Sequence, residues 1–173
     1  MSILIGKKNF NNNKLDLVVL ITKIIIIIFS AYSVTANFLP FFEGSNPYFY
    51  GTNAVILAEG QFSITNDLLQ ETGWPGLIPE NWLMTKHGTA VPMSGTGLMF
   101  AGSLFYLIGG YYGLFYLSPI CFVILLIASE RTSSKLFGNY VGLVTLLIVS
   151  SSNLLFRNSI ELQTESIFSL FFV

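Results

Sequence analysis

The sequence predicts an all-α fold: a polytopic transmembrane helical bundle of about four spans plus a truncated fifth, with interfacial helices in the first outer loop. Two observations carry this prediction. Of 173 residues, 53% are hydrophobic and 10% are charged, whereas soluble domains carry nearer a quarter charged residues. The apolar residues also gather in long runs, as bilayer-spanning segments require. A soluble cytoplasmic enzyme is excluded, because 8 Lys+Arg and 9 Asp+Glu cannot cover a globule of this size.

The first predicted span covers residues 17–39 and follows a tail at residues 1–16. A hydrocarbon core of about 30 Å requires roughly 20 apolar residues in a helix. Lys23 lies about a third of the way into this run, so we expect its side chain to snorkel toward the nearer headgroups. The run is too long for a signal peptide, which predicts an uncleaved anchor.

Lysines place the N-terminus in the cytoplasm. Lys7, Lys8 and Lys14 precede the first span, whereas Lys86 is alone in the segment that follows it. Under the positive-inside rule, residues 40–91 form an extracytoplasmic loop of a multi-pass plasma-membrane protein.

The sequence of this outer loop predicts helices that lie on the membrane surface. Residues 48–59 have apolar side chains at helical spacing, with Pro47 in the first turn and Gly60 as a stop. A second short helix is predicted at residues 67–72. Trp74 and Trp82 are expected to anchor the loop at headgroup depth, because so short a segment cannot form a core of its own.

Residues 92–173 hold the further spans. Three apolar stretches occupy residues 92–108, 114–128 and 140–156, and the chain ends in a short apolar run at residues 166–173 that we interpret as the start of a truncated span.

The positive-inside rule leaves two topologies open for this part. If every stretch crosses, the connection at residues 129–135, with Arg131 and Lys135, falls outside. Alternatively, the glycine-rich segment 92–113 re-enters without crossing. Crossing is the favoured reading. Glycines four residues apart, at 109 and 113 and at 138 and 142, predict close helix packing.

No motif identifies a soluble cofactor site. The sequence has no phosphate-binding loop, dinucleotide fingerprint, HExxH pair or Cys/His cluster. The single Cys121 excludes a disulfide framework, and a net charge of −1 gives no reason to expect nucleic acid as a partner.

Several short motifs occur in an order that resembles a known family. They are Asn46-Pro-Tyr-Phe-Tyr50 followed by Ala54 and Ala58-Glu-Gly60, Val91-Pro92 before a glycine-marked span, Ser134-Lys-Leu-Phe-Gly138, and Ser150-Ser-Ser-Asn153 with Glu165 twelve residues later. This order resembles the N-terminal part of the polytopic glycosyltransferases of the C-type fold, which include protein O-mannosyltransferases and the lipid A aminoarabinose transferase.

The resemblance implies transfer of a sugar from a polyprenyl-phosphate carrier to an acceptor on the outer face of the lipid bilayer. Such transfer needs a carboxylate to take the acceptor proton and cationic groups or a metal ion to stabilise the leaving phosphate. It implies Glu43 and Asn46 as catalytic residues, and Tyr50, Lys86, His87 and Glu165 as substrate-binding residues. A divalent metal ion is a candidate cofactor.

One departure from the family pattern keeps alternatives open. Asn46 stands where the family has aspartate, and an amide cannot act as a base. Glu43 is the nearest carboxylate able to replace it; otherwise Asn46 caps a helix and Glu43 is a solvated loop acid. The same departure favours a second hypothesis, a non-catalytic subunit whose membrane-protein partner supplies the missing spans. A transporter fragment is the weakest hypothesis, because few charges lie within the spans.

Overall fold

The computed structural model describes residues 10–37, 45–65, 82–85, 89–92 and 96–160. In chain order the elements are α1 (Phe10–Asn37), α2 (Ser45–Ala58), β1 (Ile64–Thr65), β2 (Trp82–Met84), β3 (Thr89–Pro92), α4 (Thr96–Phe137), α5 (Asn139–Ser150) and α6 (Asn153–Ile160).

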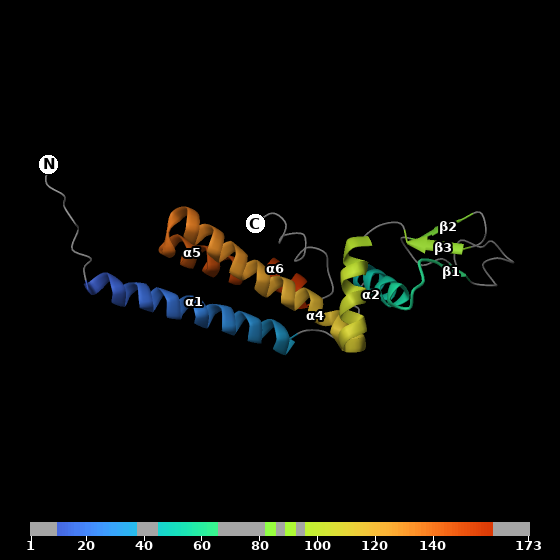
Figure 1. Ribbon diagram of the computed structural model, residues 1–173, viewed down its shortest axis with the longest axis horizontal. Coiled ribbons are helices and arrows are strands. Elements are labelled where there is room, and N and C mark those ends of the chain that lie inside the picture. Colours follow the sequence, from blue (N-terminus) through green and yellow to red (C-terminus); the bar gives the residue numbers. More distant parts are fainter. Residues whose placement is uncertain (1–9, 38–44, 66–81, 86–88, 93–95, 161–173) are drawn as a thin grey trace.

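The molecule is elongated and has two regions, as Figure 1 shows. We call one the helical bundle: α1, residues 111–137 of α4, α5 and α6. We call the other the sheet unit: α2, the three strands and residues 96–109 of α4. The strands form an antiparallel sheet in the order β1-β3-β2. The described residues are mostly helical, as predicted, but the all-α prediction missed this small sheet.

Gly110 separates the two regions within α4. Its backbone angles, φ 61° and ψ −150°, fall in a region that is essentially open to glycine alone. Past this bend the two halves of α4 come close together, because a side chain at Gly113 would meet the backbone carbonyl of Phe105. The predicted close packing is therefore confirmed at Gly113, whereas Gly109 faces open space.

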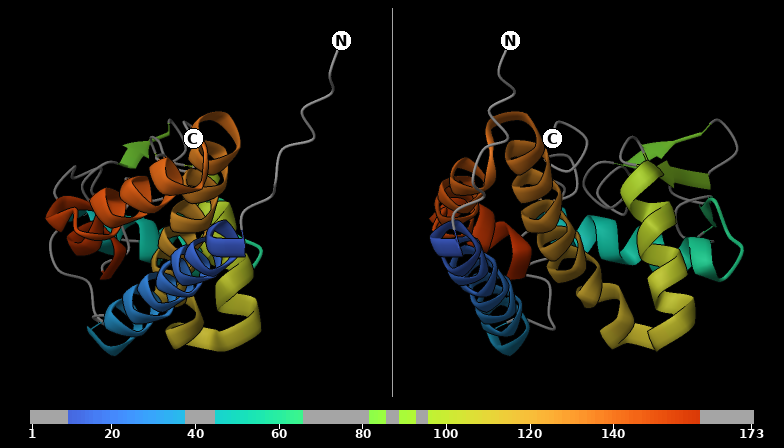
Figure 2. Two further views of the ribbon diagram at one scale, coloured as in Figure 1. Left: turned by 90° about the vertical axis from the view of Figure 1, so that its left-hand side faces the viewer. Right: turned by 60° about the vertical axis from the view of Figure 1, so that its left-hand side comes forward.

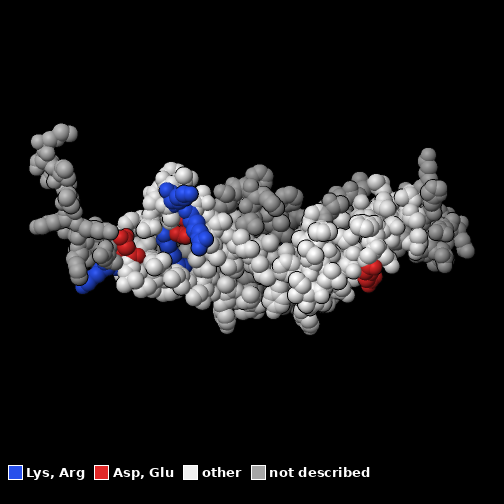
Figure 3. All heavy atoms as spheres, in the orientation of Figure 1, with Lys and Arg blue, Asp and Glu red and all other residues white. Residues whose placement is uncertain are grey.

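The bend returns α4 alongside α1 in the opposite direction, so α4 ends near the point where α1 begins (Figures 1 and 2). On the face drawn in Figure 3, the Lys and Arg side chains gather at that same end. This arrangement favours the topology in which residues 92–113 do not cross, since Arg131 and Lys135 then share a side with Lys14.

Two described helices are long and apolar enough to cross a membrane: Lys14–Asn37 and Gly97–Phe137. A third crossing requires α5 and α6 together, and these are bent by 60°. The chain thus has the features of an integral membrane protein, while the predicted four spans are not confirmed. The connection predicted at 129–135 is part of α4, which remains helical to Phe137. The terminal run at 166–173 lies outside the described residues.

Three apolar cores hold the regions together. In the bundle the core is Val34, Phe122, Leu126 and Leu146. At the junction it is Ala54, Leu98, Leu114, Phe115, Leu117 and Cys121. In the sheet unit it is Phe49, Trp82 and Ala90.

The sheet-unit core corrects two predictions. Trp82 was expected at headgroup depth, but on β2 it is 7% exposed and packs in this core. The outer segment was expected to lack a core, yet α2 and the strands share one, because they also pack against α4. Trp74 and the short helix predicted at 67–72 lie outside the described residues.

Candidate functional site

The predicted outer site begins at α2, a helix predicted at residues 48–59 and found at Ser45–Ala58. It starts at Ser45, so Asn46 and Pro47 lie in its first turn. It ends at Ala58, and Gly60, two residues later, has φ 78°. The N–H of Gly60 donates to the Leu57 carbonyl and the N–H of Gln61 to the Ile56 carbonyl, both at 3.0 Å. These two bonds form a glycine-stopped helix end, and they confirm the predicted stop.

Tyr50 is the predicted site residue whose side chain the structure describes. It is half-buried, packs against the junction core and the sheet-unit core, and meets the Phe49 ring edge-on at 5.4 Å between centroids. Glu43, Lys86, His87 and Glu165, and the side chain of Asn46, lie outside what the structure describes, so the joint placement of these residues stays a prediction. Among the described residues, no group of three or more His, Cys, Asp or Glu side chains could hold a metal ion.

Asn53 is a polar residue of α2 that the sequence reading missed. It follows Asn46 by seven residues and Tyr50 by three, a spacing that puts all three on one helical face. It is 3% exposed, and neither its Oδ1 nor its Nδ2 finds a hydrogen-bond partner among the described residues. Asn53 is among the residues that line a pocket of about 130 Å³ between α2, β2, β3 and α4. The described lining is Asn53, Ile56, Leu57, Gln61, Phe62, Trp82, Pro92, Met99 and Phe100.

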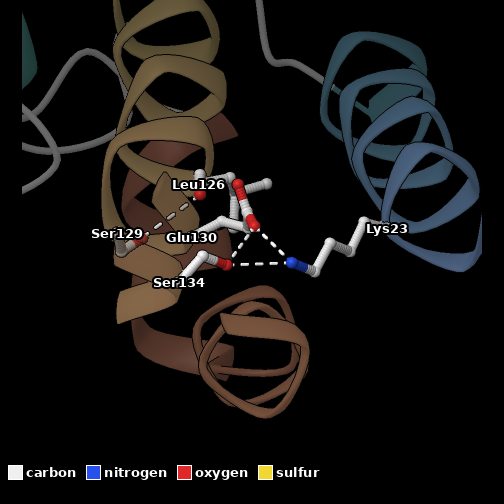
Figure 4. Close-up of polar contacts among 5 residues, drawn as sticks. All are labelled: Lys23, Leu126, Ser129, Glu130 and Ser134. Atoms are coloured by element: carbon white, nitrogen blue, oxygen red, sulfur yellow. Dashed lines mark hydrogen bonds and ion pairs between the residues drawn. The ribbon is translucent and has the colours of Figure 1, made fainter. Parts of the chain in front are cut away.

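A second polar site lies inside the helical bundle (Figure 4). We call it the buried triangle: Lys23 of α1 with Glu130 and Ser134 of α4. The Lys23 Nζ lies 2.6 Å from Glu130 Oε1 and donates to Ser134 Oγ at 2.9 Å. Ser134 Oγ donates to the same Glu130 oxygen at 2.6 Å. Each of the three side chains therefore contacts the other two.

Three helices build the buried triangle. Glu130 and Ser134 are four residues apart and share one face of α4. On α1 the buried residues Val19, Lys23, Ser30 and Val34 recur at intervals of four, seven and four, so the polar residues face the bundle. Gly142 lets α5 approach, because a side chain there would meet Ser134 and the Glu130 carbonyl. The predicted close packing at Gly142 is thus confirmed, whereas Gly138 faces open space.

The burial of Lys23 corrects the snorkelling prediction. Its side chain is 8% exposed and that of Glu130 is 15% exposed. Lys23 lies nine residues beyond Lys14, where the candidate span begins, or about 14 Å along the helix axis at 1.5 Å per residue. The Lys23 ammonium is therefore stabilised by its ion pair with Glu130 and not by the headgroups, because an unpaired charge in an apolar bundle is unfavourable.

A pocket of about 430 Å³ opens beside the buried triangle. Its described polar lining is Lys23, Glu130, Arg131 and Asn139, and its apolar lining comes from α1 and Ile127. Two cations face one carboxylate there, so the pocket carries one excess positive charge. Intramembrane pairs of this kind either join helices or mark functional sites.

One signal could have found the buried triangle. No glycine or proline occurs between Pro119 and Gly138, so the sequence contains no residue that would terminate the helix near residue 129. With α4 continued, Glu130 becomes an acid in an apolar helix that needs a basic partner, and Lys23 is the one lysine of the first span. No comparable signal exists for Asn53, because its burial depends on the strands that cover α2.

Comparison with known protein families, with curated proteins and with solved structures finds no match for this chain. The resemblance to the C-type glycosyltransferases therefore stays a prediction from the motifs quoted above.

Proposed function

We propose that this chain forms the N-terminal portion of a membrane glycosyltransferase that transfers a sugar from a polyprenyl-phosphate carrier to an acceptor on the outer face. The observation that carries the proposal is the position of the sheet unit. α2 starts eight residues after α1 ends, and the sheet unit lies beyond the bundle, away from the end where α1 begins (Figure 1). A surface-bound lipid headgroup would meet this unit first.

In this proposal Glu43 takes the proton of the acceptor hydroxyl, since Asn46 cannot. Lys86 and His87, with or without a divalent metal ion, stabilise the phosphate that leaves. Tyr50 and Glu165 contact the substrate. The half-buried position of Tyr50 between two cores supports its part, because a rigid side chain can orient a ligand.

Sugar transfer from polyprenyl-phosphate donors, measured with the full reading frame, tests the proposal. Glu43→Gln is expected to lower the rate by a factor on the order of 10²–10⁴, the usual contribution of a general base. Asn46→Asp is expected to raise it. Glu59→Gln, an exposed acid just past the other end of α2, is the matched control and should change nothing. Absence of transfer from every donor would overturn the function, and an unchanged Glu43→Gln would remove Glu43 from the mechanism.

The orientation of the molecule is a separate part of the proposal. In a Cys121→Ser background, we expect Glu59→Cys to react with a membrane-impermeant maleimide added outside the cell. Lys135→Cys should react only after permeabilisation. Both positions are exposed, so accessibility to the reagent reports the side of the membrane. The opposite pattern would place the sheet unit in the cytoplasm.

The second candidate function is a non-catalytic subunit of a membrane complex, which the amide at Asn46 favours. It predicts that a partner protein copurifies stoichiometrically from mild detergent, and that neither Glu43→Gln nor Asn46→Asp alters the activity of that complex. Recovery of the monomer alone counts against it.

A further inference from the structure

The pocket beside the buried triangle contains one cation that the fold does not pair. Lys23 and Glu130 form an ion pair in its wall, so their charges balance. Arg131 also lines the pocket, is exposed, and makes no hydrogen bond or ion pair with any described residue. Because its guanidinium is accessible and carries several N–H donors, an anion is the complementary ligand.

A second accessible donor lies in the same pocket. Asn139 is exposed and is the first residue of α5. No side chain caps this helix, so the N–H groups of its first turn add to the positive potential. Arg131 and Asn139 belong to different helices and approach a ligand from different directions. A tetrahedral phosphate presents oxygens in several directions, whereas the two oxygens of a carboxylate share one plane, so this arrangement favours a phosphate.

The apolar walls of the pocket indicate that the phosphate belongs to a lipid. Leu20 and Ile24 of α1 line the pocket, lie one helical turn apart, and are exposed. Both belong to the candidate span Lys14–Asn37, so the wall continues onto the face of α1 that acyl chains would contact. A soluble phosphate would leave these walls uncovered. The volume of about 430 Å³ is in the usual range for pockets that bind small molecules, about 300–1,000 Å³.

The position of Arg131 along α4 suits a headgroup. It lies six residues before the end of the helix at Phe137, or about 9 Å along the helix axis. A long arginine side chain extends from such a depth toward the headgroup region. This end of α4 lies near the start of α1 (Figure 1), which the orientation proposed above places in the cytoplasmic leaflet. Basic pockets between membrane helices on that side are known to bind anionic headgroups.

We propose that this pocket binds an anionic phospholipid, with its phosphodiester at Arg131 and Asn139 and an acyl chain along Leu20 and Ile24. A lipid of net charge −1 neutralises the excess positive charge of the pocket. A zwitterionic lipid brings its own cation and leaves the excess in place. The inference goes beyond the proposed function and does not depend on it, because it requires only that the chain lies in a bilayer.

Native mass spectrometry of the full chain in mild detergent tests the proposal. The detergent contains equal amounts of dioleoyl phosphatidylglycerol and dioleoyl phosphatidylcholine, which have the same acyl chains and differ in net charge. We expect the first bound lipid to be phosphatidylglycerol. Arg131→Gln should lower the association constant of phosphatidylglycerol by at least about tenfold, because it removes charge-assisted hydrogen bonds. Arg131→Lys keeps the charge without the planar fork and should recover part of the loss.

Lys135→Gln is the matched control. Lys135 is an exposed cation one turn beyond Arg131 on α4, and it is not among the described residues that line the pocket. Its removal should lower the association constant by a factor of about two, as for other exposed charges. An equal loss in Lys135→Gln and Arg131→Gln would overturn the pocket in favour of general attraction to the charged end of the molecule. Equal binding of the two lipids to the native chain would also overturn it.

Two competitors separate the possible sources of the anion. Glycerophosphoglycerol has the same headgroup without acyl chains, and at the concentration of the lipid it should not displace phosphatidylglycerol. Displacement would overturn the lipid in favour of a soluble phosphate ester. Oleate has an acyl chain and a carboxylate, and it should compete weakly. If oleate binds more tightly than phosphatidylglycerol, the pocket recognises a fatty acid and the proposed phosphodiester is wrong.

Discussion

The helical bundle and the sheet unit differ in whether a buried polar side chain has hydrogen-bond partners among the described residues. In the bundle, the buried Lys23 is bonded by two partly buried side chains, Glu130 and Ser134. In the sheet unit, Asn53 is buried more deeply and bonds to none of the described residues. A paired polar group helps to fix the packing of helices, whereas an unpaired buried one is unfavourable to the fold.

Ser118 of the bundle is also buried without a partner among the described residues, but it differs from Asn53 in an important way. A serine hydroxyl in a helix has the carbonyl three or four residues earlier within reach, and a rotation about its χ1 angle can form that bond. The longer asparagine amide has two polar atoms to satisfy. The contrast between the two regions therefore holds at Asn53.

The largest expected effect is on the paired site. Glu130→Leu leaves the Lys23 ammonium buried without a counter-charge, which is expected to lower the free energy of unfolding by about 3–5 kcal/mol. Reversible unfolding in mixed detergent micelles measures it. The double variant Lys23→Met with Glu130→Leu should recover most of this loss, because an apolar pair replaces the ion pair.

Glu59→Leu is the matched control for Glu130→Leu. This acid is exposed, so its removal should change the free energy of unfolding by no more than about 0.5 kcal/mol. If Glu130→Leu lowers the free energy of unfolding no more than Glu59→Leu does, the buried triangle does not stabilise the packing of α1 against α4.

A smaller effect is expected where the two regions meet. Gly113→Ala puts a methyl group against the carbonyl of Phe105, and backbone cannot move aside as a flexible side chain can. We expect a loss of about 1–3 kcal/mol in the free energy of unfolding, typical of overpacking.

Gly109→Ala, four residues earlier, is the natural comparison for Gly113→Ala. A methyl group there meets nothing within 4 Å, so alanine should be neutral or stabilise by up to about 1 kcal/mol through the unfolded state. Thermal unfolding of the two variants side by side checks the difference. Equal effects would mean that the bend at Gly110 opens in solution.

Sequence reasoning predicted local elements better than their assembly. The first span and the α2 helix with its glycine stop follow from residues within a few positions of each other, so their signals survive in the sequence. The Lys23–Glu130 pair joins residues 107 positions apart, and hydropathy carries no information about which helices face each other. The sheet was not predicted for a related reason: its strands have two to four residues, which is too short to show an alternating pattern.

The candidate site divides in the same way. The helix that carries Asn46 and Tyr50 was predicted, because capping and spacing are local. The pocket at Asn53 was not predicted, because its walls come from α2, β2, β3 and α4. Only the packing of these elements turns an ordinary helix asparagine into a buried, unpaired amide. Trp82 shows the same limit: a tryptophan in a membrane protein indicates an interface, yet strand pairing beside β3 makes it core.

The smallest predicted change has the opposite sign to the others. Asn53→Leu replaces an unpaired buried amide by an apolar group of the same branched shape, and the neighbouring pocket gives room for its larger volume, so it should raise the free energy of unfolding by on the order of 1 kcal/mol. Ser118→Ala, the corresponding change in the bundle, should have an effect near zero, since the hydroxyl can bond a helix carbonyl. Thermal unfolding of both variants beside the native protein measures the two changes. A loss of stability in Asn53→Leu would mean that Asn53 has a partner in the folded protein, and the contrast between the two regions would then disappear.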